Sequence, residues 1–235
     1  VAPCFPMLGT TDNLNVLGSL KLGKYSSWFT DVYSNEVSDA CERILTQLAD
    51  NFGTKTREII LPELEEMRAA HVVSIGSETL RHLYPHLEEG RRTELSYDVR
   101  LNMALFESFL AADYVAAQSL RRRIMHYHME VFKQVDVIVT PTTGMTAPKI
   151  PPSSMKIGET DLETTGYLMR FVIAPNLIGL PAISVPVGHD KDGLPIGLQL
   201  IGRPWAEATL LRLASKIEEL APRQKRPIVF YDVLK

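Results

Sequence analysis

The segment PNLIGLPAISVPVGHDKDGLPIGLQLIGRPW (Pro175–Trp205) constrains the fold of this chain more than any other. It contains two apolar runs, Leu180–Val187 and Leu194–Ile201, of a length that is typical of buried strands. Glycine and proline interrupt both runs where a strand would otherwise carry branched side chains. Because glycine permits close approach and proline ends strand pairing, we expect two buried strands that fit closely beneath a functional site.

The first part of the chain is predicted to form a β-α-β unit. Leu20–Lys24 alternates like a strand, and Asn35–Asn51 carries apolar residues at helical spacing. A second strand is expected at Thr56–Pro62, after Gly53 has ended the helix. Since strands joined through a helix normally run in the same direction, we expect these two to pair in parallel.

The remaining elements complete an α/β pattern. A helix is expected from Pro62 onward, and the long helical region Ser96–Gln134 should break once, because uninterrupted helices of that length are uncommon. The β-branched run Val135–Thr140 predicts a strand that is buried on both faces and ends at Pro141. Further helices are expected at Glu163–Ile178 and Trp205–Leu220. This order predicts a mixed β-sheet between layers of α-helices.

Composition excludes several classes of function. With 235 residues, 45% of them apolar, the chain can bury a core, and a formal charge of −3 argues against nucleic-acid binding. Cys4 and Cys41 are too few and too far apart for a disulfide framework, so we expect a reducing compartment and no structural metal. No stretch reaches the roughly 20 apolar residues of a membrane-spanning helix, which predicts a soluble or peripheral protein. The start at Val1, without an initiator methionine, indicates a piece of a longer polypeptide.

Two polar clusters resemble functional motifs but have simpler interpretations. Ser153 and Lys156 match S-x-x-K, in which a lysine serves as the base for a serine, yet two prolines precede them and we interpret the segment as a surface loop. His126 and Glu130 share a helix face while His128 points away, so the three cannot converge on a metal. We therefore expect a partly exposed helix surface there.

Other candidates keep two interpretations each. For Arg121–Arg123 a solvated helix face is favoured over a membrane-surface contact, because the three side chains spread around the helix. The loop TPTTGMTAP (Thr140–Pro148) is either a ligand-binding edge of the sheet or a rigid turn. Two apolar stripes on helices are more readily interpreted as part of the hydrophobic core than as the lining of a ligand pocket. They comprise Val72 and Ile75 on one helix and Leu101, Leu105 and Phe109 on the next.

Three motifs together resemble the C-terminal half of the amidase signature family. They are D-x-[IL]-x-x-P-T from Asp136, N-x-x-G-x-P-A-x-S-x-P-x-G from Asn176, and G-L-P-x-G-x-Q-x-[IM]-G-x-[PA] from Gly193. Within that family, PELEEMRAAHVVSIGS and SYDVRLNMALFESFLAADYVAAQSLRRR look most like the plant fatty acid amide hydrolases. The resemblance implies that residues 1–235 are the C-terminal portion of a single amidase domain with the amidase-signature fold.

The resemblance also implies a reaction, the hydrolysis of N-acylethanolamines and related lipid amides. In the family the nucleophilic serine, a second serine in a cis peptide and a neutral lysine base all lie in the N-terminal half. This chain has no G-G-S-S-G-type or G-G-S-[IV]-R-type segment, so no residue of it is assigned a catalytic role. No cofactor is implied, and we expect the isolated chain to be inactive.

What the resemblance assigns to this chain is the wall of an acyl pocket. The implied residues are Val72, Ile75, Leu105, Phe106, Phe109, Thr165 and Met169. The implied partner is a long-chain acyl amide, with peripheral contact to the endoplasmic reticulum or plasma membrane, or alternatively a cytoplasmic location, and a homodimer is left open. Two alternatives remain: another amidase-signature enzyme with a polar substrate, such as a general amidase or the A component of an amidotransferase, or a truncated, non-catalytic lipid- or partner-binding product.

Overall fold

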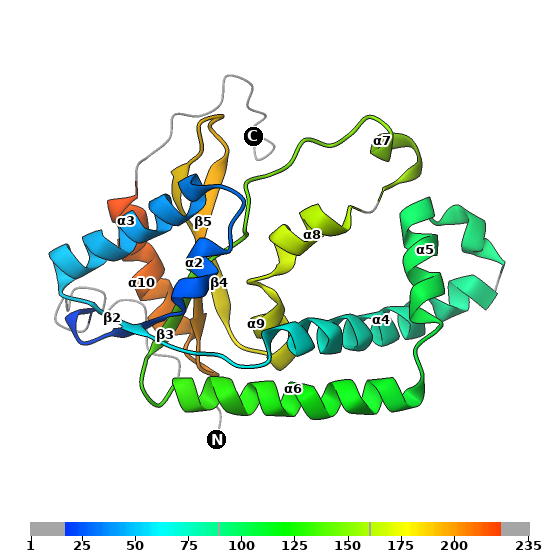
Figure 1. Cartoon of the computed structure of the whole chain (residues 1–235), viewed down its shortest axis with the longest axis horizontal. Coiled ribbons are helices and arrows are strands. Elements are labelled where there is room, and N and C mark those ends of the chain that lie inside the picture. Colours follow the sequence, from blue (N-terminus) through cyan, green and yellow to red (C-terminus); the bar gives the residue numbers. More distant parts are fainter. Residues whose placement is uncertain (1–16, 89, 160, 222–235) are drawn as a thin grey trace.

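A five-stranded mixed sheet organises the computed structural model, which describes residues 17–88, 90–159 and 161–221 (Figure 1). Its strands lie in the order β2-β1-β3-β5-β4. They are β1 (Lys21–Lys24), β2 (Lys55–Glu58), β3 (Val137–Pro141), β4 (Ala182–His189) and β5 (Pro195–Gly202). β1 pairs in parallel with β2 and β3, whereas β5 pairs antiparallel with β3 and β4. Val1 and Cys4 lie outside the described residues.

The predicted β-α-β unit is confirmed. Helix α3 (Asn35–Phe52) begins where the Ser34 side chain accepts a hydrogen bond from the Glu36 amide, and it ends at Gly53, whose φ is 72°. Strand β2 stops at Glu58, so the expected strand over Thr56–Pro62 was too long. The physical reason is that β1 ends at Lys24 and offers no further partner, and Ile59 makes the last hydrogen bond to the Lys24 carbonyl.

The two apolar runs form the expected pair of strands, and their turn is closed by one side chain. Asp190 Oδ1 accepts hydrogen bonds from the amides of Asp192 and Leu194. β3 ends at Pro141, as expected, but it begins at Val137, two residues later than the predicted run; Pro141 itself still pairs with Leu198. Pairing with β1 has already stopped at Val139, so a proline without an amide hydrogen is tolerated at that end of β3.

The middle of the chain forms an antiparallel helical arm on one side of the sheet (Figure 1). Helix α4 (Leu64–Glu88) lies beside α6 (Ala111–Val131), and a hydrogen bond of 2.9 Å from Gln118 Nε2 to Ser74 Oγ joins them. α5 (Tyr97–Phe106) is separated from α6 by one turn, which confirms the single break expected in Ser96–Gln134. The remaining helices are α2 (Ser26–Thr30), η2 (Arg91–Glu94), α7 (Ser154–Ile157), α8 (Leu162–Met169), α9 (Ile173–Ile178) and α10 (Glu207–Leu220).

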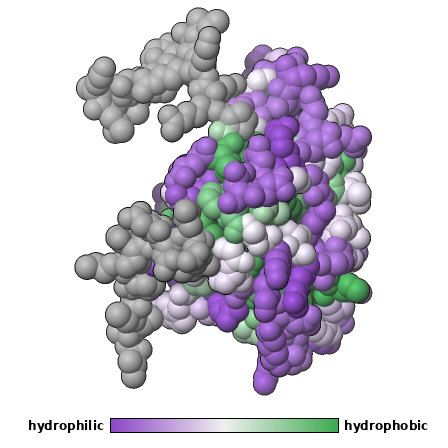
Figure 2. Space-filling model, turned by 90° about the vertical axis from the view of Figure 1, so that its left-hand side faces the viewer, coloured by the Kyte–Doolittle hydropathy of each residue, from purple (hydrophilic) through white to green (hydrophobic). Residues whose placement is uncertain are grey.

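The core surrounds the sheet: α3 and α10 pack against β4 and β5, and buried residues of β1, β3, α2, α6 and α9 belong to the same cluster. The helical arm leaves much of its apolar surface uncovered. The face in Figure 2 is largely hydrophilic, with small hydrophobic patches. Most of the large apolar side chains that remain exposed lie instead on α4 to α8, among them Val72, Ile75, Leu101 and Leu105. The segment expected as one helix, Glu163–Ile178, is divided between α8 and α9 around Phe171, which is buried.

Candidate functional site

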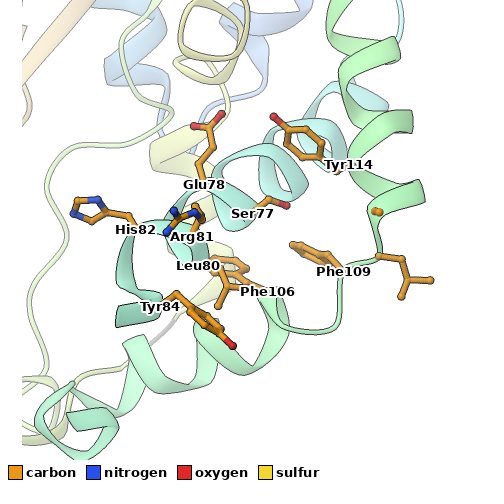
Figure 3. Close-up of a pocket in the computed structure, with 11 residues that line it drawn as sticks. Ser77, Glu78, Leu80, Arg81, His82, Tyr84, Phe106, Phe109 and Tyr114 are labelled. Atoms are coloured by element: carbon orange, nitrogen blue, oxygen red, sulfur yellow. The ribbon is translucent and has the colours of Figure 1, made fainter. Parts of the chain in front are cut away.

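A pocket of about 1150 Å³ lies between α4 and the turn that joins α5 to α6 (Figure 3). Its apolar lining is largely aromatic, and charged or hydroxyl groups stand beside it. The lining residues are Ser77, Glu78, Leu80, Arg81, His82, Tyr84, Phe106, Phe109, Leu110, Ala111 and Tyr114. Small-molecule sites are typically pockets of about 300–1,000 Å³ with an apolar interior and a few polar groups, and this pocket is slightly larger than that range.

Helical spacing explains how the pocket is built. Ser77, Arg81 and Tyr84 lie on one face of α4, at intervals of four and three residues. The opposite wall comes from the α5–α6 turn, where the Phe106 and Phe109 rings lie 5.9 Å apart at an interplanar angle of 37°. The turn is held by Asp113, whose Oδ2 accepts a hydrogen bond of 2.8 Å from the Leu110 amide. The Phe109 amide also donates to the Phe106 carbonyl at 3.2 Å, so backbone hydrogen bonds hold the turn that carries both rings.

The structure brings together some of the predicted acyl-pocket residues and not others. Phe106 and Phe109 line the pocket. Val72, Ile75 and Leu105 are 41%, 46% and 50% exposed and do not line it. On α4, Val72 and Ile75 lie roughly 140–160° around the helix from Ser77, which places them on another face.

Two further members of the predicted set lie on α8. Thr165 is exposed, and Met169 packs against the core. Neither residue contributes to the lining of the pocket between α4 and the α5–α6 turn.

The core interpretation of the two apolar stripes was wrong for most of their members. Val72, Ile75 and Leu105 are exposed, and so is Leu101, at 54%. The residues of α4 that are buried include Met67 and Ala70, which belong to the hydrophobic core. Periodicity identifies residues that share a face, but it does not reveal what that face meets.

Sequence reasoning missed several residues of this pocket. Leu80 and Tyr84 are four residues apart on α4, and Leu110 and Tyr114 are four apart at the start of α6. Those spacings are the signal that could have found them, since such pairs lie one above the other on a helix.

The loop after β3 is tied down on both sides, which favours the rigid-turn interpretation. The Tyr33 amide donates to the Gly144 carbonyl, and the Gly144 amide donates to the Tyr167 carbonyl, each at 2.7 Å. At the base of the loop the hydroxyls of Thr142 and Ser184 lie 2.6 Å apart. Its outer part, Met145–Lys149, lines a second pocket of about 530 Å³ that also includes Glu36, Asp190 and Asp192.

The S-x-x-K segment does not form a serine–lysine pair. Contrary to our expectation of a loop, it forms one helical turn, in which the Lys156 amide donates to the Ser153 carbonyl at 3.1 Å. The Ser153 and Ser154 hydroxyls both donate to Glu159 Oε2, at 3.1 and 3.0 Å, and the Lys156 side chain is exposed. Local hydrogen bonding to Glu159 thus accounts for the segment.

His128 is buried, not on a partly exposed surface as we expected, because α6 turns it toward the interior. Only 1% of it is exposed, its Nδ1 lies 2.9 Å from the Ile124 carbonyl, and burial lowers its pKa. His126 is exposed on another side of the helix. Within residues 17–88, 90–159 and 161–221, no group of three or more histidine, cysteine or acidic side chains is placed to hold a metal.

Two other features of the described chain bear on function. The three arginines Arg121–Arg123 are exposed, and Arg123 Nε donates to Glu63 Oε2 at 2.6 Å. Cys41 is buried on α3, which raises the pKa of its thiol to about 12 and makes it a poor nucleophile. No helix in the described ranges is long and apolar enough to cross a membrane.

Comparison with known proteins gives relatives over nearly the whole chain. The amidase family model matches residues 8–211. A fatty acid amide hydrolase from Arabidopsis thaliana is 62% identical over 232 residues, covering 99% of this chain and 38% of that protein. One from Medicago truncatula is also 62% identical, with the same coverage. The A component of a glutamyl-tRNA(Gln) amidotransferase from Thermodesulfovibrio yellowstonii is 32% identical, covering 88% of this chain and 46% of that protein.

Solved structures agree with this family and confirm the predicted fold class. The A component of the Thermotoga maritima glutamyl-tRNA(Gln) amidotransferase matches with a TM-score of 0.66 at 30% identity, covering 88% of this chain and 44% of that one. A crystal structure of an amidase matches with a TM-score of 0.74 at 21% identity, covering 86% and 46%. The chain spans about two fifths of the length of its plant relatives. It belongs to the amidase signature family and is a partial homologue of the plant fatty acid amide hydrolases.

Proposed function

We propose that this chain is the C-terminal portion of a fatty acid amide hydrolase. The complete enzyme would hydrolyse N-acylethanolamines and related lipid amides to a free fatty acid and an amine. The observation that carries the proposal is the 62% identity to plant fatty acid amide hydrolases, against 32% to the A component of an amidotransferase over a similar stretch. The whole of residues 1–235 would then belong to one amidase domain.

The proposal places the catalytic serines and lysine outside this chain. A lysine can act as a base only when it is neutral, and burial is what lowers its pKa sufficiently. No lysine in the described part of the chain is buried, and the Ser153 and Ser154 hydroxyls are engaged with Glu159. Both observations support a role for this chain in binding and scaffolding, with bond cleavage carried out elsewhere in the enzyme.

The proposed role is to supply part of an acyl-binding wall. Phe106 and Phe109 already line a largely apolar pocket, and Val72, Ile75 and Leu105 present exposed apolar surface on α4 and α5. With Thr165 and Met169 of α8, they form the proposed set. Each methylene removed from water contributes about 0.8 kcal/mol, so a wall of this kind favours long acyl chains over short ones.

The location belongs to the proposal as well. Lipid amides partition into membranes, so an enzyme that takes them from the endoplasmic reticulum or plasma membrane would bind there peripherally. Leu101 of α5, which is 54% exposed and does not belong to the proposed acyl wall, is compatible with such a surface. A homodimer of the complete enzyme is a separate question that sedimentation would answer.

An acyl-chain series tests the proposed function directly. The complete polypeptide encoded by the reading frame that contains this chain would be assayed with N-acylethanolamines of 2 to 20 acyl carbons. We expect kcat/KM to rise with chain length, and a Ser153→Ala variant to match the wild type. A preference for short or polar amides would favour a general amidase or an amidotransferase component instead.

The isolated 235 residues provide the second arm of the test. We expect them to show no amide hydrolysis, and turnover that is lost in Ser153→Ala would overturn the assignment of the catalytic residues. If the reading frame encodes no more than this chain and the chain binds long-chain fatty acid without turnover, a non-catalytic lipid-binding product is the correct interpretation.

A further inference from the structure

A glycine stands in the middle of α4 at a point where the helix touches α5. Gly76 is buried, and its backbone is that of an ordinary helix, a conformation in which alanine is intrinsically more favourable. A Cβ atom at this position would lie 2.6 Å from Phe106 Cδ1 and 2.9 Å from Phe106 Cγ. The backbone geometry does not require glycine here, but the contact with Phe106 does.

A second glycine inside a helix, Gly166, serves for comparison with Gly76. Gly166 lies inside α8, and a Cβ atom there would meet nothing within 4 Å. A glycine inside a helix therefore need not lie against another side chain. The close approach of Phe106 to the backbone is specific to Gly76.

We propose that Gly76 is a positioning residue that sets the place of the Phe106 ring and, through it, the length of acyl chain that the pocket accepts. The inference rests on the proposed function, because it assigns the pocket to the acyl chain. Phe106 forms the pocket wall together with Phe109, and Figure 3 labels both among the residues that line the pocket. Without a Cβ on Gly76, the ring can lie directly against the α4 backbone.

The contact cannot be relieved by rotating the ring. Cγ lies on the axis about which a phenylalanine ring turns, so it stays 2.9 Å from the added Cβ whatever the ring angle. Favourable carbon–carbon contacts lie at about 3.5–4.0 Å, so the side chain must retreat by about 1 Å. That movement displaces the wall and disturbs the Phe106–Phe109 pair.

The first arm of the test measures the contact itself in the complete polypeptide, independently of catalysis. We expect Gly76→Ala to lower Tm by about 2 °C or more, while Gly166→Ala leaves Tm unchanged or raises it. In a Phe106→Ala background, Gly76→Ala should no longer lower Tm, because the ring that it displaces is gone. Equal losses of Tm with and without the Phe106 ring would overturn the inference.

The second arm measures chain-length preference by titrating the same variants with saturated fatty acids of 12 and 18 carbons. We expect Gly76→Ala to weaken binding of the longer acid relative to the shorter one by about fourfold for each methylene that loses contact, and Gly166→Ala to leave the ratio unchanged. An unchanged ratio in Gly76→Ala would overturn the assignment of the pocket to the acyl chain. Hydrolysis of lipid amides by the wild type is judged separately, so failure of the inference and failure of the proposed function are distinguishable.

Discussion

Individual buried polar groups make stability depend on pH. His128 is almost completely buried, and because the Ile124 carbonyl can only accept, the Nδ1 atom carries the proton of a neutral ring. Burial lowers the pKa of His128, and also that of His71. The unfolded chain, with histidine pKa values near 6.5, therefore binds more protons than the folded one once the pH falls below about 7.

The expected result is a free energy of unfolding that is highest at a pH well above about 6.5, where the histidines are neutral in both states, and that decreases as the pH falls toward the lowered pKa values. Urea denaturation at pH 7.5 and pH 5.0 measures the difference. His128→Leu should reduce that difference, whereas the exposed His126→Leu should leave it unchanged. An identical pH dependence in wild type and His128→Leu would show that His128 does not contribute.

A second residue-scale prediction concerns Gln199 of β5. Its Nε2 donates to Thr140 Oγ1 at 3.0 Å and to the Phe171 carbonyl at 2.8 Å, and all three groups are buried. Gln199→Leu removes the donor from the buried Phe171 carbonyl and leaves Thr140 Oγ1 with its bond to the Pro141 carbonyl alone, so we expect a loss of about 1–3 kcal/mol in the free energy of unfolding. Urea denaturation checks it, with the exposed Gln134→Leu as control. If Gln199→Leu lowered the free energy of unfolding by no more than Gln134→Leu does, the Gln199 hydrogen bonds would not be contributing to stability.

At the scale of elements, local signals decide what could be predicted. The β-α-β unit, the buried strand β3 and the two strands of the final hairpin were predictable, because each carries a pattern within a few residues. The exposure of Val72 and Leu105 was not predictable, since it depends on whether another layer covers α4 and α5. The helical turn at Ser154–Ile157 was missed for a similar reason, because hydrogen bonds to Glu159 support it from outside the turn.

The N-terminus of α3 depends on a hydrogen bond to one side-chain oxygen, Ser34 Oγ, and a single substitution can test its contribution to stability. Ser34 Oγ accepts a hydrogen bond of 3.2 Å from the Glu36 amide, which would otherwise have no partner in the first turn. We expect Ser34→Ala to lower the free energy of unfolding by about 0.5–2 kcal/mol. Thermal denaturation measures it, and Ser215→Ala on the exposed side of α10 is the control. Equal stability of the two variants would show that the cap is not needed.

At the scale of the whole molecule, the sequence motifs predicted the family better than local patterns predicted the sheet. Asp136 Oδ2 accepts a hydrogen bond from the Lys21 amide across 115 residues of sequence, and β1 pairs with β3 beside it. No periodicity within either segment encodes such a pairing, because it is selected by packing of the complete fold. The pocket between α4 and the α5–α6 turn was only partly predictable, since its walls come from segments that meet only after folding.

The uncovered face of the helical arm leads to a prediction for the chain on its own. Leu101 and Leu105 are at least half exposed on successive turns of α5, and β2 and β4 each have one paired neighbour within the described sheet. Exposed apolar faces and unpaired strand edges both promote association. We therefore expect the isolated 235 residues to self-associate at micromolar concentration, as measured by size-exclusion chromatography with light scattering.

Charged substitutions on the apolar face of α5 should show whether this face or the unpaired strand edges cause the association. A Leu101→Lys/Leu105→Lys variant places two like charges on the apolar surface of α5, and if this surface drives association the variant should shift the chain toward monomer. Leu211→Lys, an exposed position on α10, is the matched control and should not shift it. Association that persists equally in both variants would assign the effect to the sheet edges, and a wild-type chain that is monomeric throughout would contradict the prediction.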